Sequence, residues 1–310
     1  MGSHSYSVLH NAAYFPLLFA FLHSGLSAAP SPIITSNAMR VRRFVSRHPL
    51  FTFVFLAYAW AWLFWIPGVI RHRSDLALTV GAYGPLFAAV VVTMLTEGGQ
   101  GVRVLLRKLF VWRVSIWWYA AAVFVPYLST VVLLPIYVLR GGSLGPFDVS
   151  GFSRLPLLIA MVIPNGPLGE ELGWRGFLLP RLTRRTSLLN ASLLIGPIWT
   201  FWHAPLFYAP FGSLISGAPV TLTSVGMFLM LVTGLSVLIA WVWHHSGGSV
   251  LLSFLMHASV NINALTLFLP GVARVQSEYF YMSMGILWIV ILAIVVIDRR
   301  SFTATPKKVC

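Results

Sequence analysis

The sequence predicts an all-α, polytopic integral membrane protein, a bundle of about eight transmembrane helices around a polar cavity. Of its 310 residues, 58% are hydrophobic and only 9% are charged, against roughly 45–50% and about 25% in soluble domains. A water-facing surface with so few charges would aggregate. Apolar runs close to the ~20 residues that cross a hydrocarbon core recur along the chain. The single cysteine, Cys310, excludes an intramolecular disulfide and a cysteine-based metal cluster.

Eight apolar runs account for the expected helices. The fourth contains Pro164, Pro167 and several glycines, so we expect a broken helix there rather than a uniform span. The runs are Leu50–Ile70, Leu76–Leu95, Ser115–Leu139, Leu155–Leu182, Leu188–Tyr208, Leu222–Trp243, Gly248–Leu269 and Tyr279–Ile297.

The N-terminal residues 1–38 do not fit this pattern. Tyr14–Ala29 is a short apolar stretch interrupted by His23, which is consistent with a signal sequence, an extra membrane-associated segment or an upstream extension. We therefore predict an N-terminal extension or signal-like segment (1–38), a single transmembrane domain (39–300) and a cytoplasmic tail (301–310).

The net charge of +14 is distributed unevenly about the predicted spans. Fifteen of the 21 Lys and Arg residues fall on one side and five on the other, with Arg175 inside a run. Positive charge gathers in cytoplasmic loops of membrane proteins. We therefore expect a multi-pass integral membrane protein with both termini, Arg103–Arg113 and Arg181–Arg185 on the cytoplasmic side. For a bacterial protein this would be the plasma or inner membrane. The charge then indicates contact with membrane lipid and no nucleic-acid partner.

The chain has only seven acidic residues, and two of them, Glu170 and Glu171, are adjacent inside the fourth run. Carboxylates at membrane depth need partners, protonation or a wet cavity. On a helix, Glu171 and Arg175 are four residues apart and can form an ion pair. Glu170 points about 100° away and lacks that partner, so it is a candidate proton acceptor. The alternative is an ionic contact that only closes the helix bundle.

Two histidines, His203 and His257, lie well inside predicted spans. His257 and Asn261 are four residues apart and share a helix face, where paired donors suit an oxyanion. The alternatives are structural. His203 would then be a core histidine bonded to a backbone carbonyl, and His257 with Asn261 would form a hydrogen-bonded contact between helices.

The order and spacing of these residues resemble the CAAX protease and bacteriocin-processing family, the type II CAAX prenyl endopeptidases. The signatures of that family are Glu-Glu-x-x-x-Arg, Phe-x-x-x-His and His-x-x-x-Asn. The first matches at Glu170–Arg175 and the third at His257–Asn261, whereas the second has Trp199 in place of phenylalanine before His203. We assign Trp199 to a cavity wall, where the change would affect the fit of the substrate.

The resemblance implies an intramembrane, glutamate-type endopeptidase. Its partner would be the C-terminal peptide of a membrane-associated protein, isoprenylated in some members, and bacterial relatives are also associated with bacteriocin maturation or self-immunity. Glu170 and His203 would activate a water molecule, with Glu170 as general base, and His257 and Asn261 would bind the oxyanion. Supporting positions would be Glu171, Arg175 and Trp199.

Three other hypotheses stay open. Glu170, His203 and His257 could bind zinc with an open fourth position, although no His-Glu-x-x-His motif is present; we expect neither a metal nor another cofactor. A non-catalytic membrane immunity or scaffold protein could have the same fold. A channel or transporter is a third hypothesis, but no matching motif occurs in a second half. The enzyme hypothesis requires all four polar groups to face one cavity.

Overall fold

The computed structural model describes residues 32–70, 75–209 and 219–304, and within these ranges all regular structure is helical. The predicted all-α class is confirmed. The chain divides into two units, Met1–Arg43 and Phe44–Cys310. The described part of the first unit belongs to helix α2 (Pro32–Arg47), and every other described helix lies in the second. Most of the predicted N-terminal segment, and the end of the tail, lie outside the described residues.

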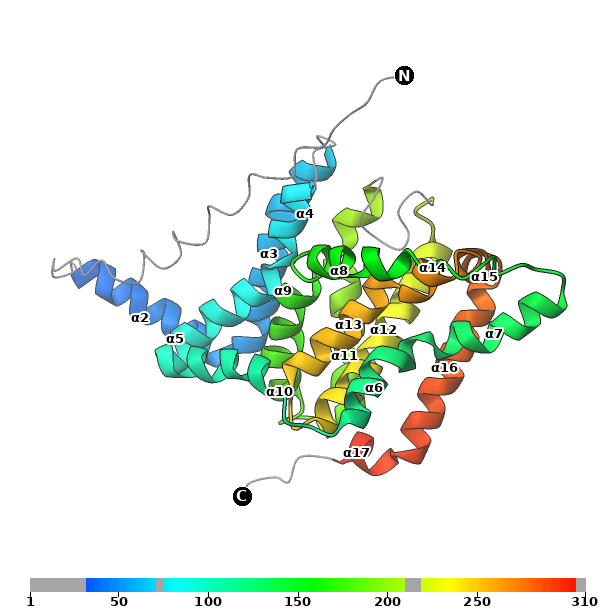
Figure 1. The fold of residues 1–310 in the computed structure, drawn as a ribbon. Helices are drawn as coiled ribbons and strands as arrows, with labels where there is room; N and C mark the ends of the chain where they lie inside the picture. The colour runs from blue at the N-terminus through cyan, green and yellow to red at the C-terminus, as the bar shows by residue number, and fades with distance from the viewer. Residues whose placement is uncertain (1–31, 71–74, 210–218, 305–310) are drawn as a thin grey trace. The chain divides into compact units, whose positions relative to one another are not determined.

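The second unit contains the apolar helices (Figure 1). Short 3-10 turns η1 (Lys108–Phe110), η2 (Val125–Tyr127) and η4 (Ala204–Tyr208) connect some of them, and η3 (Leu172–Leu178) is a π-helix. The α-helices are α3 (Pro49–Ile70), α4 (Asp75–Ala82), α5 (Gly84–Arg107), α6 (Ile116–Phe124), α7 (Leu128–Leu139), α8 (Gly151–Val162), α9 (Pro167–Glu171), α10 (Leu179–Leu182), α11 (Leu188–Trp202), α12 (Leu222–His245), α13 (Val250–Ile262), α14 (Ala264–Phe268), α15 (Val272–Glu278), α16 (Phe280–Ile297) and α17 (Arg299–Thr303).

Five helical segments of the described chain are long and apolar enough to cross a membrane, and three shorter apolar helices, α8, α11 and α13, accompany them. The protein is therefore a multi-pass membrane protein. The fourth predicted run is broken, as expected, into α8, α9, η3 and α10. The fifth and seventh runs are shorter than predicted. Helix α11 stops at Trp202 because Pro205 follows, and α13 stops where Asn263 adopts a left-handed conformation, with φ 48°.

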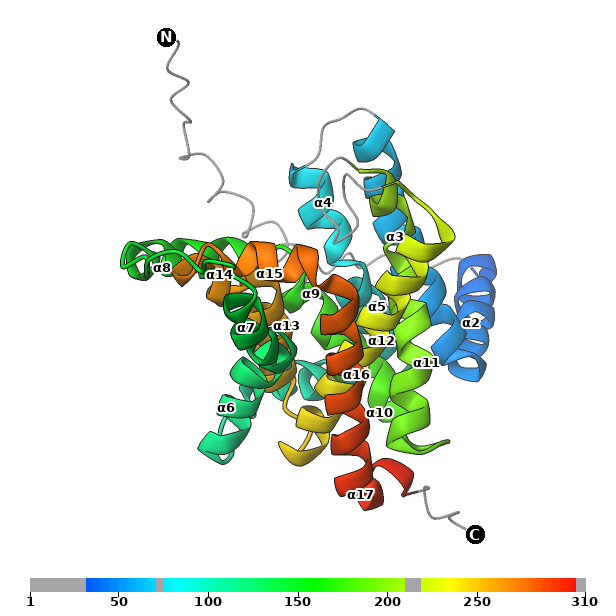
Figure 2. The ribbon, with the colours of Figure 1, turned by 90° about the vertical axis from the view of Figure 1, so that its right-hand side faces the viewer.

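In Figure 1, helices α11 and α13 lie in the middle of the second unit, whereas α8 lies across one end of it. Helix α11 packs along α12, and α12 also contacts α13 (Figures 1 and 2). On the other side, α5 packs against α3, α9 and η3. Helix α8 crosses the end of α13 and contacts α14. This arrangement surrounds the broken fourth run with helices that are distant in the sequence.

Two glycines permit close contact between backbones in this region. A Cβ atom on Gly173 of η3 would lie 2.4 Å from Cβ and 2.6 Å from the carbonyl carbon of Pro85 in α5. A Cβ atom on Gly196 of α11 would lie 2.7 Å from Cα of Thr233 in α12. Small residues at such contacts let helix backbones approach closely, which is how membrane helices associate. The positions of η3 and α11 thus depend on the absence of these side chains.

We expect Gly173→Ala to destabilise the protein, because the added methyl group overlaps the backbone of Pro85, and overpacking typically costs about 1–3 kcal/mol. The matched control is Gly226→Ala in α12, where a Cβ atom would meet nothing within 4 Å. Thermal unfolding of both purified variants in detergent checks this. Equal midpoints for the two variants would contradict the packing described here.

Candidate functional site

The break in the fourth run places Glu170 and Glu171 at the start of a new helix. Gly166 has φ 143°, a conformation that residues with a side chain rarely adopt, and Pro167 follows at the first helical position. Helix α9 then continues into η3, whose seven residues are all buried. The π-helix is a rare form that is frequent at functional sites. The turn and the π-helix together fix where the two carboxylates and Arg175 lie.

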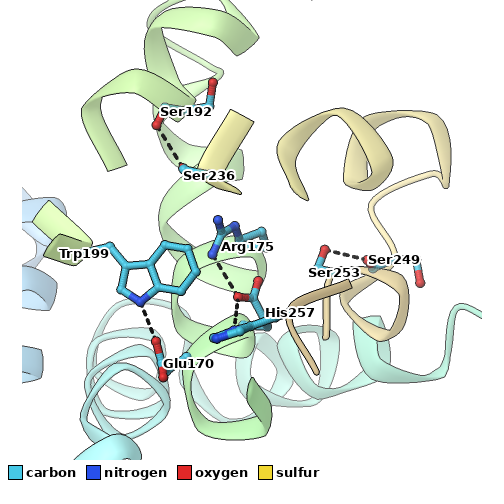
Figure 3. A network of polar contacts seen from close by, with 9 residues as sticks. Glu170, Arg175, Ser192, Trp199, Ser236, Ser249, Ser253 and His257 are labelled. Carbon is cyan, nitrogen blue, oxygen red and sulfur yellow. Dashed lines mark hydrogen bonds and ion pairs between the residues drawn. The ribbon is translucent and has the colours of Figure 1, made fainter. Parts of the chain in front are cut away.

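Glu171 is fully buried and has two partners. Its Oε1 atom accepts a hydrogen bond from Nη1 of Arg175 at 2.9 Å, so the predicted ion pair is present. The same oxygen lies 2.9 Å from Nδ1 of His257 in α13, 86 residues away. Glu171 therefore does more than pair with Arg175, because it also fixes the orientation of the His257 ring (Figure 3).

Trp199 of α11 contacts the carboxylate, guanidinium and imidazole groups of the site. Its indole Nε1–H donates a hydrogen bond to Oε2 of Glu170. The guanidinium of Arg175 lies 4.5 Å from the centre of its ring, and the His257 ring packs against it edge to face at 5.0 Å. The backbone carbonyl of Trp199 is 2.8 Å from Nδ1 of His203. One residue of α11 thus contacts four of the residues singled out from the sequence.

His203 directly follows α11 and is partly buried among aromatic rings, including those of Trp65 and Phe228. Because the Trp199 carbonyl can only accept a hydrogen bond, Nδ1 of His203 carries the proton in this contact. This is the backbone bond that a core histidine would make. In the neutral ring, it leaves Nε2 as a hydrogen-bond acceptor.

Asn261 lies near the end of α13, at the edge of the site. A Cβ atom built on Gly166 would lie 3.0 Å from Oε1 of Glu170 and 4.0 Å from Nδ2 of Asn261, so both side chains border that glycine. Asn261 is exposed, whereas Glu170 is only 4% exposed and His257 only 5%. The site therefore consists of buried charged groups with an exposed amide at its edge.

The contacts bring together the residues predicted from the sequence. Trp199 links Glu170, His203 and His257, and Gly166 adjoins both Glu170 and Asn261. Among the described residues, no group of three His, Cys, Asp or Glu side chains is arranged to hold a metal ion. The sequence did not indicate the central place of Trp199. The available signal was its position one helical turn before His203, together with an N–H group that phenylalanine lacks.

Comparison with known proteins shows what this region is similar to. Residues 152–263 match the model of the family described as Type II CAAX prenyl endopeptidase Rce1-like. The chain is also 28% identical over 182 residues to CAAX prenyl protease 2 of Methanococcus maripaludis. That alignment covers 56% of this chain and 64% of the relative, so it spans less than two thirds of the relative's length. The resemblance drawn from the three motifs is confirmed.

We expect Glu171→Gln to lower thermal stability strongly. The amide carries no charge, so the buried guanidinium of Arg175 loses its ion pair, and breaking a buried pair costs about 3 to 5 kcal/mol. The control is Glu97→Gln, because Glu97 pairs with Arg181 while its own side chain is half exposed, and such pairs contribute at most about 1 kcal/mol. Unfolding midpoints measured in detergent compare the two variants. If the unfolding midpoint of Glu171→Gln falls as little as that of Glu97→Gln, the buried ion pair of Glu171 is not required for stability.

We expect the indole N–H of Trp199 to report on Glu170. Hydrogen bonds to a carboxylate are shorter and stronger than those to a neutral amide, so Glu170→Gln should move this proton resonance upfield in ¹H–¹⁵N spectra. The signal is assigned by its disappearance in Trp199→Phe. Trp241 is the control, since its indole also donates to a carboxylate, that of Asp298, at 3.1 Å. We expect the Trp241 signal to stay in place in Glu170→Gln. If the Trp199 signal also stays in place, the hydrogen bond between Trp199 and Glu170 is contradicted.

Proposed function

We propose that the protein is an intramembrane endopeptidase, because residues 152–263 match the model of the Type II CAAX prenyl endopeptidase Rce1-like family. It hydrolyses a peptide bond near the C-terminus of a membrane-associated protein or peptide. The observation that carries this proposal is that Trp199 contacts both Glu170 and His203. Asn261 is exposed at the edge of this group of residues. A buried carboxylate and a histidine acceptor that both contact Trp199 are the kinds of group that water activation needs.

In the proposed reaction, Glu170 is the general base and Nε2 of His203 holds the water molecule. Glu170 removes one proton as the water oxygen bonds to the scissile carbonyl carbon, which forms a tetrahedral oxyanion. The protonated Glu170 then transfers this proton to the departing amine nitrogen as the C–N bond breaks. The products are a free carboxyl and a free amine, and Glu170 returns to its carboxylate form. Trp199 holds the Glu170 carboxylate in place throughout.

The oxyanion is bound by Asn261 and His257. The amide of Asn261 donates from Nδ2. His257 can donate from Nε2 only as an imidazolium, because its Nδ1–H already faces Glu171. By analogy with single oxyanion-hole deletions, each donor is worth about 3 to 4 kcal/mol in the transition state. Both bonds strengthen as negative charge develops, so their loss lowers kcat more than it raises KM.

For the orientation, we propose that both termini face the cytoplasm. The support is the gathering of positive charge at one end of the second unit. Contacts between Arg181 and Glu97, between His245 and Asp298, and between Ser249 and the carbonyl of Val111 bring several loops together at this end. The basic residues there are Arg107, Lys108, Arg113, Arg181, Arg184, Arg185, Arg299 and Arg300. Such loops are characteristically cytoplasmic.

We expect Glu170→Ala and His203→Ala each to lower kcat/KM by about 10² to 10⁴, and the double variant to be little worse than either, because each change alone disables the activated water. Substrates are first found by comparing protein C-termini in membranes that contain wild type or Glu170→Ala, and one of them then serves for kinetics. Glu97→Gln is the active control. Unchanged C-termini with a folded Glu170→Ala protein would favour the non-catalytic immunity or scaffold alternative.

The same assay decides between glutamate and zinc chemistry. Glutamate catalysis requires that cleavage survives exhaustive chelation in a preparation without bound zinc. Stoichiometric zinc in the wild type, lost in His203→Ala or His257→Ala, would establish the metal mechanism instead.

A further inference from the structure

The end of helix α13 is held by residues from other parts of the chain. Asn261 is the second-last residue of this helix, which stops where Asn263 adopts a left-handed conformation, with φ 48°. Asparagine is one of the few residues besides glycine that adopt this conformation. Beyond such a break, backbone groups need partners outside the helix. The N–H of Ala264, the first residue of α14, is one of these groups.

Tyr127 is the partner of this N–H group. It is the last residue of η2 and is only 9% exposed. Its hydroxyl donates a hydrogen bond to the carbonyl of Ser259 and accepts one from the N–H of Ala264 at 3.2 Å. One phenol oxygen thus joins a backbone group two residues before Asn261 to a backbone group three residues after it.

Two further contacts hold the same stretch of chain. The Oγ atom of Ser259 lies 3.2 Å from the carbonyl oxygen of Ala122 in α6. The side-chain amides of Asn263 and Gln276 bond in both directions, at 2.9 Å and 3.2 Å. Gln276 belongs to α15, and Figures 1 and 2 show α14 and α15 at the same end of the second unit as α8. The backbone is therefore fixed on both sides of Asn261.

Asn261 depends on this support more than His257 does. The ring of His257 is buried and lies against the Glu171 carboxylate at 2.9 Å. Asn261 is exposed, and the ends of helices fray. A donor to an oxyanion has to lie about 2.7–3.1 Å from the position that this oxygen takes. The placement of the Asn261 amide is thus set by the backbone of the last turn of α13.

We propose that Tyr127 is a positioning residue for the oxyanion donor Asn261. Tyr127 does not touch the substrate in this scheme, which rests on the proposed function; it acts through the backbone on either side of Asn261. Both Tyr127 and Gln276 lie outside residues 152–263, the part that matches the family model. Segments beyond the matched part thus hold one of the proposed oxyanion donors in place.

Tyr127→Phe tests this role, because it removes the hydroxyl and keeps the ring. We expect kcat to fall about 10- to 100-fold, since a displacement of about 1 Å can cost 10²-fold. KM should stay nearly constant, because the bond to the oxyanion forms mainly in the transition state. Tyr119→Phe is the matched control with wild-type kcat. The Tyr119 hydroxyl also donates to a backbone carbonyl, that of Trp112 before α6, at 2.7 Å.

A double-mutant cycle separates positioning from a general loss of structure. If Tyr127 acts through Asn261, Tyr127→Phe lowers kcat no further in the Asn261→Ala background. An equal fold-loss in both backgrounds would overturn the proposal, and so would a wild-type kcat in Tyr127→Phe.

The placement of Asn261 can also be followed without activity. In full-length protein labelled with ¹⁵N-asparagine in detergent, the side-chain amide signals of Asn261 are identified by their loss in Asn261→Ala. We expect these signals to shift or broaden in Tyr127→Phe and to stay in place in Tyr119→Phe. Gln276→Met, which removes the amide pair with Asn263, takes the place of Tyr127→Phe if that variant does not fold. Unchanged Asn261 signals would overturn the proposal.

The two measurements distinguish failure of the positioning role from failure of the proposed function. Altered Asn261 signals in Tyr127→Phe, in a protein without Glu170-dependent cleavage, would support the hold of Tyr127 on Asn261 and refute the endopeptidase. Glu170-dependent cleavage with a wild-type kcat and unchanged Asn261 signals in Tyr127→Phe would leave the endopeptidase in place and refute the role of Tyr127.

Discussion

The burial of two adjacent carboxylates is the constraint on which this site depends. An ionised carboxylate is very costly in an apolar interior unless it is paired and hydrogen-bonded. Glu171 meets this requirement with Arg175 from its own helix and His257 from α13, and Glu170 meets it with the indole of Trp199 from α11. The hydrogen bonds and ion pairs of these two side chains therefore constrain how η3, α11 and α13 lie relative to one another.

Close packing supports this network. The π-helix η3 turns Arg175 toward Glu171 while Gly173 lies directly against Pro85. Lys108 donates from Nζ to the carbonyl of Gly176 at 2.6 Å, which satisfies a backbone group of the irregular helix. Irregular backbone at membrane depth is tolerated where protein surrounds it, and every residue of η3 is buried.

The two central helices, α11 and α13, are short and end at the site. Helix α11 has 15 residues and α13 has 13. At about 1.5 Å per residue, both are shorter than the ~30 Å hydrocarbon core. Because each ends at the site, His203 and Asn261 lie where the helices stop.

Local chemistry in the sequence determined much of this. Composition and apolar runs fixed the helical membrane class. The prolines and Gly166 predicted the break in the fourth run, and the four-residue spacing of Glu171 and Arg175 predicted their ion pair, which the structure contains. These features depend on the helical period and on backbone conformation, and both can be judged from neighbouring residues.

Only the tertiary structure decided which distant groups meet. The contact between Glu171 and His257 joins residues 86 positions apart, and that between Glu170 and Trp199 joins residues 29 positions apart. The period of a single helix does not set such contacts. They depend on how closely two backbones approach and on the rotation of each helix about its axis, which the glycine contacts and the buried charges settle together. For that reason Trp199, assigned from the sequence to a cavity wall, is found bonded to the buried carboxylate.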